Sequence, residues 1–236
     1  MSELKELRNR LEIEFADLLA PDLAANGASR IHVVLTSETD LVTCGAFTAL
    51  TSPRLWRWLE PFTQKWNGPA PCLLIDGATI SSDCGGHLPS MLERFIAVVT
   101  HEVGHIASVP GLFEPVDPLI DEHAELARQF FVASVADRSM FYQGSSPRDG
   151  HGYEWIRACI HLTHRMRQRG WNVWLPGVID REFYGYSSTS IYSRALGDEC
   201  RRLEDIPLTS LQYIPAPAAF IDQWNADLAQ WPDGEF

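Results

Sequence analysis

The sequence predicts a domain of the α+β class, in which a helix and a small β-sheet come first and several helices follow. Residues 3–19 place leucine and phenylalanine at helical spacing, which is typical of an amphipathic helix. Residues 30–36 and 71–76 are short apolar runs of the kind that form strands. Further helical patterns begin at residue 90. The order helix, strands, helices is the order of an α+β fold.

The clearest helix is expected at residues 90–108. Ser90 can cap its first turn, and Glu93 three positions later completes the pattern of a capping box. Pro110 and Gly111 follow the helix and are expected to end it.

The rest of the chain is divided by loop signals. Gly85-Gly86 and the polar residues 143–150 predict loops, and we assign no element to the tryptophan-rich stretch from Ser37 to residue 70. Gly170 is expected to end the helix before it. Further helices are expected at about residues 117–137, 151–168, 189–204 and 217–230.

Composition excludes several classes of function. The chain has 236 residues, 45% of them hydrophobic, so it can bury a sizeable core. No apolar run is long enough to cross a membrane, and the charged amphipathic start does not resemble a secretory signal. The formal charge of −12 disfavours nucleic acid as a partner. We therefore expect a cytoplasmic protein whose partner is neither nucleic acid nor membrane.

The cysteines also favour the reducing environment of the cytoplasm. Their number is odd and none is spaced as CxxC, which argues against a disulfide framework and a zinc ribbon. Cys159 falls on the apolar face of the 151–168 helix, where a small core residue is expected. The five cysteines are Cys44, Cys72, Cys84, Cys159 and Cys200.

One motif carries chemistry. His101-Glu102-Val103-Gly104-His105 matches HExxH. On a helix, residues four apart share a face, so both imidazoles can bind one metal ion, and zinc is the expected one. Glu102 is rotated by about 100° from His101, which places it beside the metal rather than on it. It can then act as the general base on a zinc-bound water, the nucleophile of a hydrolysis. The residues around the motif are apolar, so we expect it to be buried.

A catalytic zinc usually has three protein ligands and an open fourth position. The residues leave three candidates for the third. Glu122 lies at the edge of the apolar face of the 117–137 helix, and His123 lies within that face. His151 stands at the start of the next helix, where the positive end of the helix dipole keeps an imidazole neutral.

HExxH followed by His151-Gly152-Tyr153-Glu154-Trp155 resembles the SprT-like zinc metallopeptidases. The resemblance implies that His101, His105 and His151 bind zinc and that Glu102 is catalytic. It also implies a zincin-like core made of a helix, a small sheet and the active-site helix. We accordingly expect one zincin-like domain over residues 1–236, with a catalytic core at about 1–170 and a C-terminal extension at 171–236 packed on it.

Other polar residues are expected to have lesser roles. Tyr153, Tyr184, Tyr186 or Tyr192 could stabilise an oxyanion, and the sequence does not choose among them. His161 and His164 are too far along their helix to share a metal with His151, so surface or supporting positions are expected. Asp198 and Glu199 are expected on a solvated face, with support of an imidazole as the alternative. Arg165, Arg167 and Arg169 spread around one helix and are expected to face solvent.

The leading hypothesis for function is a zinc metallopeptidase that acts on peptides or proteins. One alternative is a binding or scaffold protein that keeps a zincin-like zinc site without activity. Another is a zinc amidohydrolase that acts on a substrate other than protein.

Overall fold

The computed structural model describes residues 2–25, 28–35, 37, 47–50, 70–108, 152–179 and 185–229. The amphipathic pattern near the N-terminus forms helix α1 (Ser2–Leu18), as predicted. Its apolar stripe is buried in the core and ends on Phe15 and Leu18. A short helix, α2 (Ala20–Ala25), follows directly.

Three described strands form one sheet in the order β1-β3-β2. The two predicted strands are confirmed as β1 (His32–Leu35) and β3 (Cys72–Ile75), which pair in parallel. β2 (Phe47–Leu50) pairs antiparallel with β3 and was not predicted. The backbone N–H of Val33 also donates to the Glu12 carboxylate at 2.8 Å, which fastens α1 to β1.

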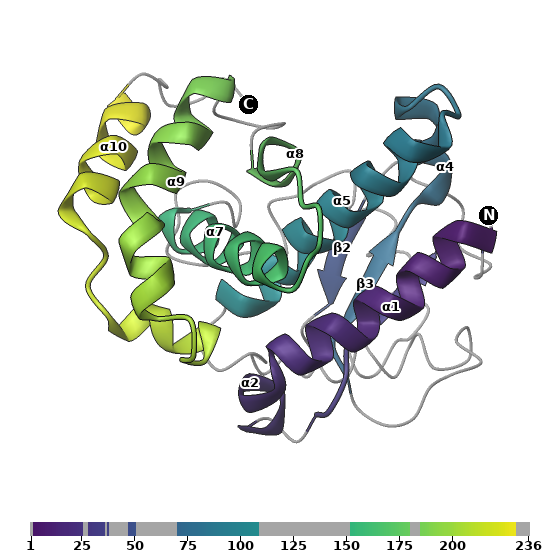
Figure 1. Cartoon of the computed structure of the whole chain (residues 1–236), viewed down its shortest axis with the longest axis horizontal. Helices are drawn as coiled ribbons and strands as arrows, with labels where there is room; N and C mark the ends of the chain where they lie inside the picture. Colours follow the sequence, from purple (N-terminus) through teal and green to yellow (C-terminus); the bar gives the residue numbers. More distant parts are fainter. Residues whose placement is uncertain are drawn as a thin grey trace, which may run out of the picture.

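Helix α5 (Leu88–Ser108) confirms the long predicted helix and lies at the centre of the fold. It contacts β2, β3 and α1, while α1 contacts β1. Because the two helices contact each other and the same sheet, they cover one face of it (Figure 1). A short helix, α4 (Gly77–Asp83), precedes α5, and the turn between them contains Gly85 and Gly86, both with positive φ as suits a glycine loop.

The described chain after residue 152 is mainly helical, and its elements are α7 (Tyr153–Gln168), α8 (Leu175–Ile179), α9 (Gly185–Arg202), the 3₁₀ helix η5 (Leu208–Tyr213) and α10 (Ala218–Ala229). Of these, α7, α8 and η5 contact α5. α7 confirms the predicted helix, and Gly170 ends it with φ +86°. α8 contacts α5, and α9 contacts both α7 and α10 (Figure 1).

The predicted cap of α5 is wrong by three residues. The helix begins at Leu88, and the His87 carbonyl accepts the N–H of Met91. Ser90 therefore lies inside the first turn, where its hydroxyl pairs with Nδ1 of His87 at 2.9 Å. Pro89 fits this earlier start because the first turn of a helix has backbone N–H groups that need no partner in the helix.

Two predictions of solvent-facing side chains on α7 and α9 are also wrong. Glu199 is 3% exposed and accepts hydrogen bonds from Arg157 and from His161, each at 2.8 Å. Burial acts to raise the pKa of Glu199, but these bonds outweigh it and lower the pKa. Arg165 is also buried and donates to the Leu203 and Ile206 carbonyls. Both sets of contacts fasten α7 to the chain from α9 onward.

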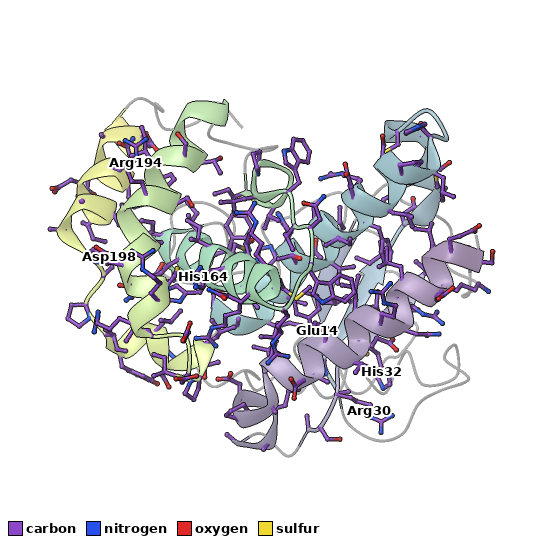
Figure 2. All side chains as sticks on the ribbon, in the orientation of Figure 1. Glu14, Arg30, His32, His164, Arg194 and Asp198 are labelled. Atoms are coloured by element: carbon purple, nitrogen blue, oxygen red, sulfur yellow. The ribbon has the colours of Figure 1, made fainter. Side chains whose placement is uncertain are left out.

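The prediction of a solvated surface holds for neighbouring residues. Asp198 is exposed and pairs with Arg201 one turn away, and Arg169 is exposed and pairs with Glu14 of α1. His164 is half-buried on the same side of the molecule as Asp198 (Figure 2). Among the described helices, none is long and apolar enough to span a membrane.

At Gly104 the backbone of α5 lies directly against side chains of α7. A Cβ placed at this position would lie 2.3 Å from Sγ of Cys159 and 3.1 Å from Nε1 of Trp155. Both neighbours belong to α7, and Cys159 is fully buried, as predicted for it. The two helices can therefore pack at this distance only with glycine at position 104.

Gly104→Ala should lower the free energy of unfolding by about 1–3 kcal/mol, because the new methyl group overfills a packed interface. The measurement is urea unfolding followed by circular dichroism. Adding Cys159→Ala should recover part of the loss, since it removes the sulfur that the methyl group meets. The matched control is Gly197→Ala in α9, where no atom lies within 4 Å of the new Cβ. It should leave stability unchanged or raise it by about 0.5–1 kcal/mol, and equal losses in both variants would contradict the packing argument.

His32 in β1 should make stability fall in mild acid. It is 5% exposed, and burial together with the Arg30 charge lowers its pKa from 6.5 to about 4 (Figure 2). The unfolded chain then binds a proton between these pH values and the folded chain does not, so stability falls as the pH drops from 6.5 to about 4. The contribution is up to about 3 kcal/mol. Urea unfolding at several pH values should show a shallower fall for His32→Asn, and an unchanged pH dependence would contradict this origin.

Candidate metal centre

The HExxH motif occupies the last two turns of α5, as predicted. Glu102 and His105 are 4% and 5% exposed, and His101 is half-buried. The surrounding Val98, Val99 and Ile106 are buried in the core. The apolar residues before and after the motif therefore bury it, which confirms the expectation drawn from them.

The two imidazoles face each other. Nε2 of His101 and Nε2 of His105 are 3.3 Å apart, and the ring planes are inclined by 70°. Two nitrogen ligands of a tetrahedral zinc, each at about 2.0–2.1 Å from the metal, are separated by about 3.3–3.4 Å. The pair thus has the spacing of two ligands of one zinc ion.

A backbone carbonyl orients the first of these rings. Nδ1 of His101 donates to the carbonyl oxygen of Val178 in α8 at 2.8 Å. A proton fixed on Nδ1 leaves the lone pair on Nε2, the nitrogen that faces His105. A metal-binding histidine is commonly held in this way through its other ring nitrogen.

Trp155 of α7 forms a wall against both rings. Its indole stacks on His105 with ring centroids 5.3 Å apart, and it meets His101 edge-on at 4.7 Å. Its Nε1–H donates to the backbone carbonyl of His101 at 3.3 Å. The rings are therefore confined from the side of α7.

Glu102 lies beside the imidazole pair. Its Oε1 is 4.0 Å from Nε2 of His101, which is longer than a hydrogen bond. A carboxylate at this distance can reach a water molecule held near the imidazoles without replacing either ring as a ligand. Burial raises the pKa of the Cys159 thiol and the nearby Glu102 charge raises it further, so Cys159 stays protonated.

The third ligand is not placed. His151, Glu122 and His123 lie outside the described residues, as do the expected 117–137 helix and the 143–150 loop. Within the described ranges, no three His, Cys, Asp or Glu side chains group as a metal site. The described part of the candidate centre is thus the pair of histidines with Glu102.

Two of the four candidate tyrosines are described in side-chain detail. The Tyr192 hydroxyl is buried and donates to Asp227 of α10, so it serves the packing of α9 and α10. Tyr153 is half-buried at the start of α7, and Glu154 and burial raise its pKa. Tyr184 and the side chain of Tyr186 lie outside the described residues.

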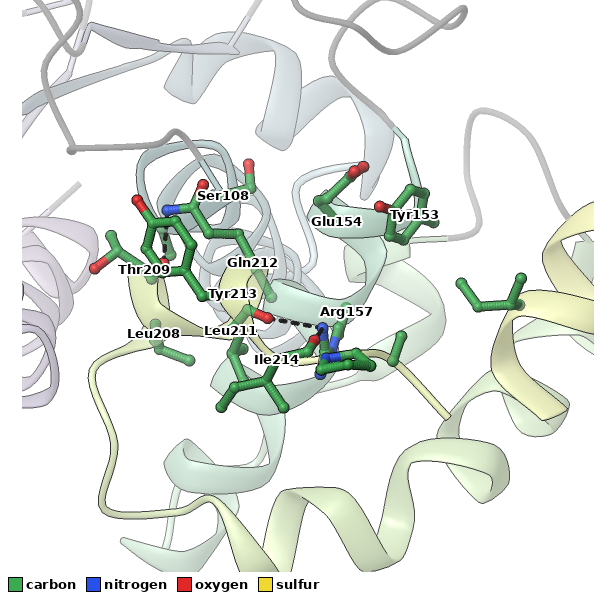
Figure 3. A pocket seen from close by; sticks show the side chains of 15 residues that line it. Ser108, Tyr153, Glu154, Arg157, Leu208, Thr209, Leu211, Gln212, Tyr213 and Ile214 are labelled. Atoms are coloured by element: carbon green, nitrogen blue, oxygen red, sulfur yellow. Dashed lines mark hydrogen bonds between the residues drawn. The ribbon is translucent and has the colours of Figure 1, made fainter. Parts of the chain in front are cut away.

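A pocket of about 260 Å³ opens at the C-terminal end of α5 (Figure 3). Ala107 and Ser108, just after His105, line it together with the first turns of α7 and with η5. Arg157 lies in its wall, and its guanidinium donates four hydrogen bonds, two to the Glu199 carboxylate and one each to the Leu211 and Ile214 carbonyls. The four described cysteines are free thiols.

Sequence reasoning missed two groups at the centre. Val178 acts through its backbone carbonyl, for which no side-chain pattern gives a signal. It also lies in the segment expected to be an extension outside the catalytic core, so residues beyond 170 take part in this centre. Trp155 was identified from the sequence only as the aromatic residue of the SprT-like pattern, and no role at the centre was predicted for it. Its position four residues after His151 within the SprT-like pattern was the available signal.

In comparisons with known proteins, no family model, no curated protein and no solved structure matches this chain.

His105→Ala should weaken zinc binding by more than about 100-fold, because it removes one ligand of the pair. The measurement is a competition titration with a chromogenic chelator. The control is His164→Ala, which removes an imidazole that pairs with Gln168 on the outer side of α7. The same titration on His151→Ala, Glu122→Ala and His123→Ala identifies the third ligand. Equal affinity of His105→Ala and the unmodified chain would contradict the site.

Proposed function

We propose that this chain is a zinc-dependent metallopeptidase of the SprT-like type with a zincin-like core. The observation that carries the proposal is the His101–His105 pair, whose Nε2 atoms have the spacing of zinc ligands while the buried Glu102 lies beside them. The carbonyl support of His101 is a second feature typical of zinc ligands.

The residues divide the chemistry among them. His101 and His105 would hold the metal, with His151 as the third ligand by resemblance. Bound zinc lowers the pKa of a coordinated water to about 7 and so makes a nucleophile available at neutral pH. Glu102 accepts the proton of the attacking water on its carboxylate and delivers it to the leaving nitrogen.

The site has the surroundings that this chemistry needs. Burial strengthens the effect of the Glu102 charge on nearby groups because little water screens it. Trp155 keeps the imidazoles from turning toward α7. The ring of His101 is fixed with its lone pair toward His105, so no reorientation has to precede metal binding.

A peptide substrate is supported by the position of β2. This antiparallel strand contacts α5 and, in the described part of the sheet, has a neighbour only on the β3 side. A strand at the edge of a sheet offers backbone N–H and C=O groups that an extended peptide can pair with. Such a peptide would run alongside the helix that carries Glu102.

Glu102→Gln should lower the rate of peptide hydrolysis about 100- to 10,000-fold and leave zinc bound, because the amide cannot accept the proton. The measurement is cleavage of a quenched fluorescent peptide mixture, with zinc content determined on the same samples. The matched control is Glu93→Gln, an exposed glutamate on the same helix, which should keep full activity.

The outcomes separate the candidate functions. Full activity of Glu102→Gln would overturn the mechanism. Stoichiometric zinc with no cleavage of any peptide would favour the scaffold protein, and cleavage of small amides but not of peptides would favour an amidohydrolase.

A further inference from the structure

The carbonyl that orients His101 is that of Val178 in the short helix α8, and the position of this helix depends on its contacts. α8 is five residues long, and a helix of this length is not stable alone in water. The place of the Val178 carbonyl must therefore come from contacts between α8 and the rest of the fold.

Two contacts fasten α8 to α5 immediately before Val178. Nη1 of Arg94 donates to the carbonyl oxygen of Gly177 at 3.1 Å. Gly177 also lies close to α5, since a Cβ there would be 3.2 Å from Cβ of Ala97. The same Cβ would be 2.3 Å from Cε3 of Trp174, the residue before α8. The carbonyl of Val178 accepts the hydrogen bond from His101, and the neighbouring carbonyl, that of Gly177, is thus held by a hydrogen bond and by close packing.

Arg94, Ala97 and His101 lie on the same face of α5. They are three and four residues apart, which places them in one row along the helix. Arg94 is about 10 Å from His101 along the helix axis, too far to touch a metal at the histidine pair. The bond from Arg94 to the Gly177 carbonyl gives it a route to the metal site through the backbone of α8.

We propose that Arg94 is a positioning residue for the zinc site, acting through the Gly177–Val178 backbone to fix the ring orientation and tautomer of His101. This inference rests on the proposed function, because it assigns Arg94 to the metal site of that function. The cationic guanidinium makes a charge-assisted bond to the Gly177 carbonyl, stronger than a bond between neutral groups. Lysine could make one such bond from the same position, whereas methionine could make none.

The matched control is Arg167, which also holds a carbonyl near α8. Its Nε and Nη2 donate to the Val173 carbonyl at 3.1 and 2.7 Å, five residues before Val178. Arg167→Met therefore removes a guanidinium–carbonyl contact of the same kind, but from a carbonyl that is not next to the one His101 uses.

The experiment compares Arg94→Met, Arg94→Lys and Arg167→Met in the full chain. Zinc affinity is measured by competition titration, and the His101 tautomer is measured by ¹⁵N NMR of the zinc-free protein. Urea unfolding on the same samples confirms that each variant is folded. Arg94→Met should weaken zinc binding about 10- to 100-fold and give a mixture of His101 tautomers. Arg94→Lys should restore most of both properties, and Arg167→Met should change neither.

The proposal is overturned if folded Arg94→Met keeps the unmodified affinity and the Nδ1–H tautomer. It is also overturned if Arg167→Met and Arg94→Met weaken zinc binding equally, since that would indicate general loosening of α8. If the unmodified chain binds no zinc, the proposed function fails, and the link from Arg94 to metal affinity fails with it. The NMR spectra of the same variants still decide whether Arg94 fixes the ring.

Discussion

At Gly104 no side chain of α5 separates its backbone from the side chains of α7, and the geometry of the candidate centre follows from this contact. The absent Cβ allows Cys159 and Trp155 to lie directly against α5. At that distance the Trp155 indole reaches both imidazoles and the carbonyl of His101. The glycine inside the HExxH motif thus has a packing role that is separate from the chemistry of the residues on either side.

Hydrogen bonds between the helices also hold the candidate centre in place. α8 gives a carbonyl to His101, and α5 holds α8 in place through Arg94. On the other side of α7, the buried Arg157–Glu199–His161 cluster joins α7 to α9 and leaves its members engaged with one another. Removing one partner from such a buried cluster is costly, about 3–5 kcal/mol. The position of Trp155 against the histidines therefore depends on residues far along the chain from the motif.

Local patterns were sufficient to predict two of the described strands and the longer described helices, but not the short helices α2, α4, α8 and η5. The periodicity of residues 3–19 and the apolar run around His101 specify their elements because the buried face repeats with the period of a helix. β2 was missed because its four residues lie in a stretch without a clear alternating pattern. Glu199 was assigned to solvent because its partners are about 40 residues away in sequence, and a helical pattern contains no information on such contacts. The same holds for the Val178 carbonyl, which the fold brings to His101 across 77 positions.

The central claim is that His101 and His105 bind one zinc ion through nitrogen. Zinc K-edge X-ray absorption of the zinc-loaded chain tests it most directly. The account predicts one zinc per chain, with a first shell of nitrogen and oxygen only at about 2.0–2.1 Å and the outer-shell scattering of at least two imidazoles. A sulfur shell at about 2.3 Å, or the absence of stoichiometric zinc, would contradict it.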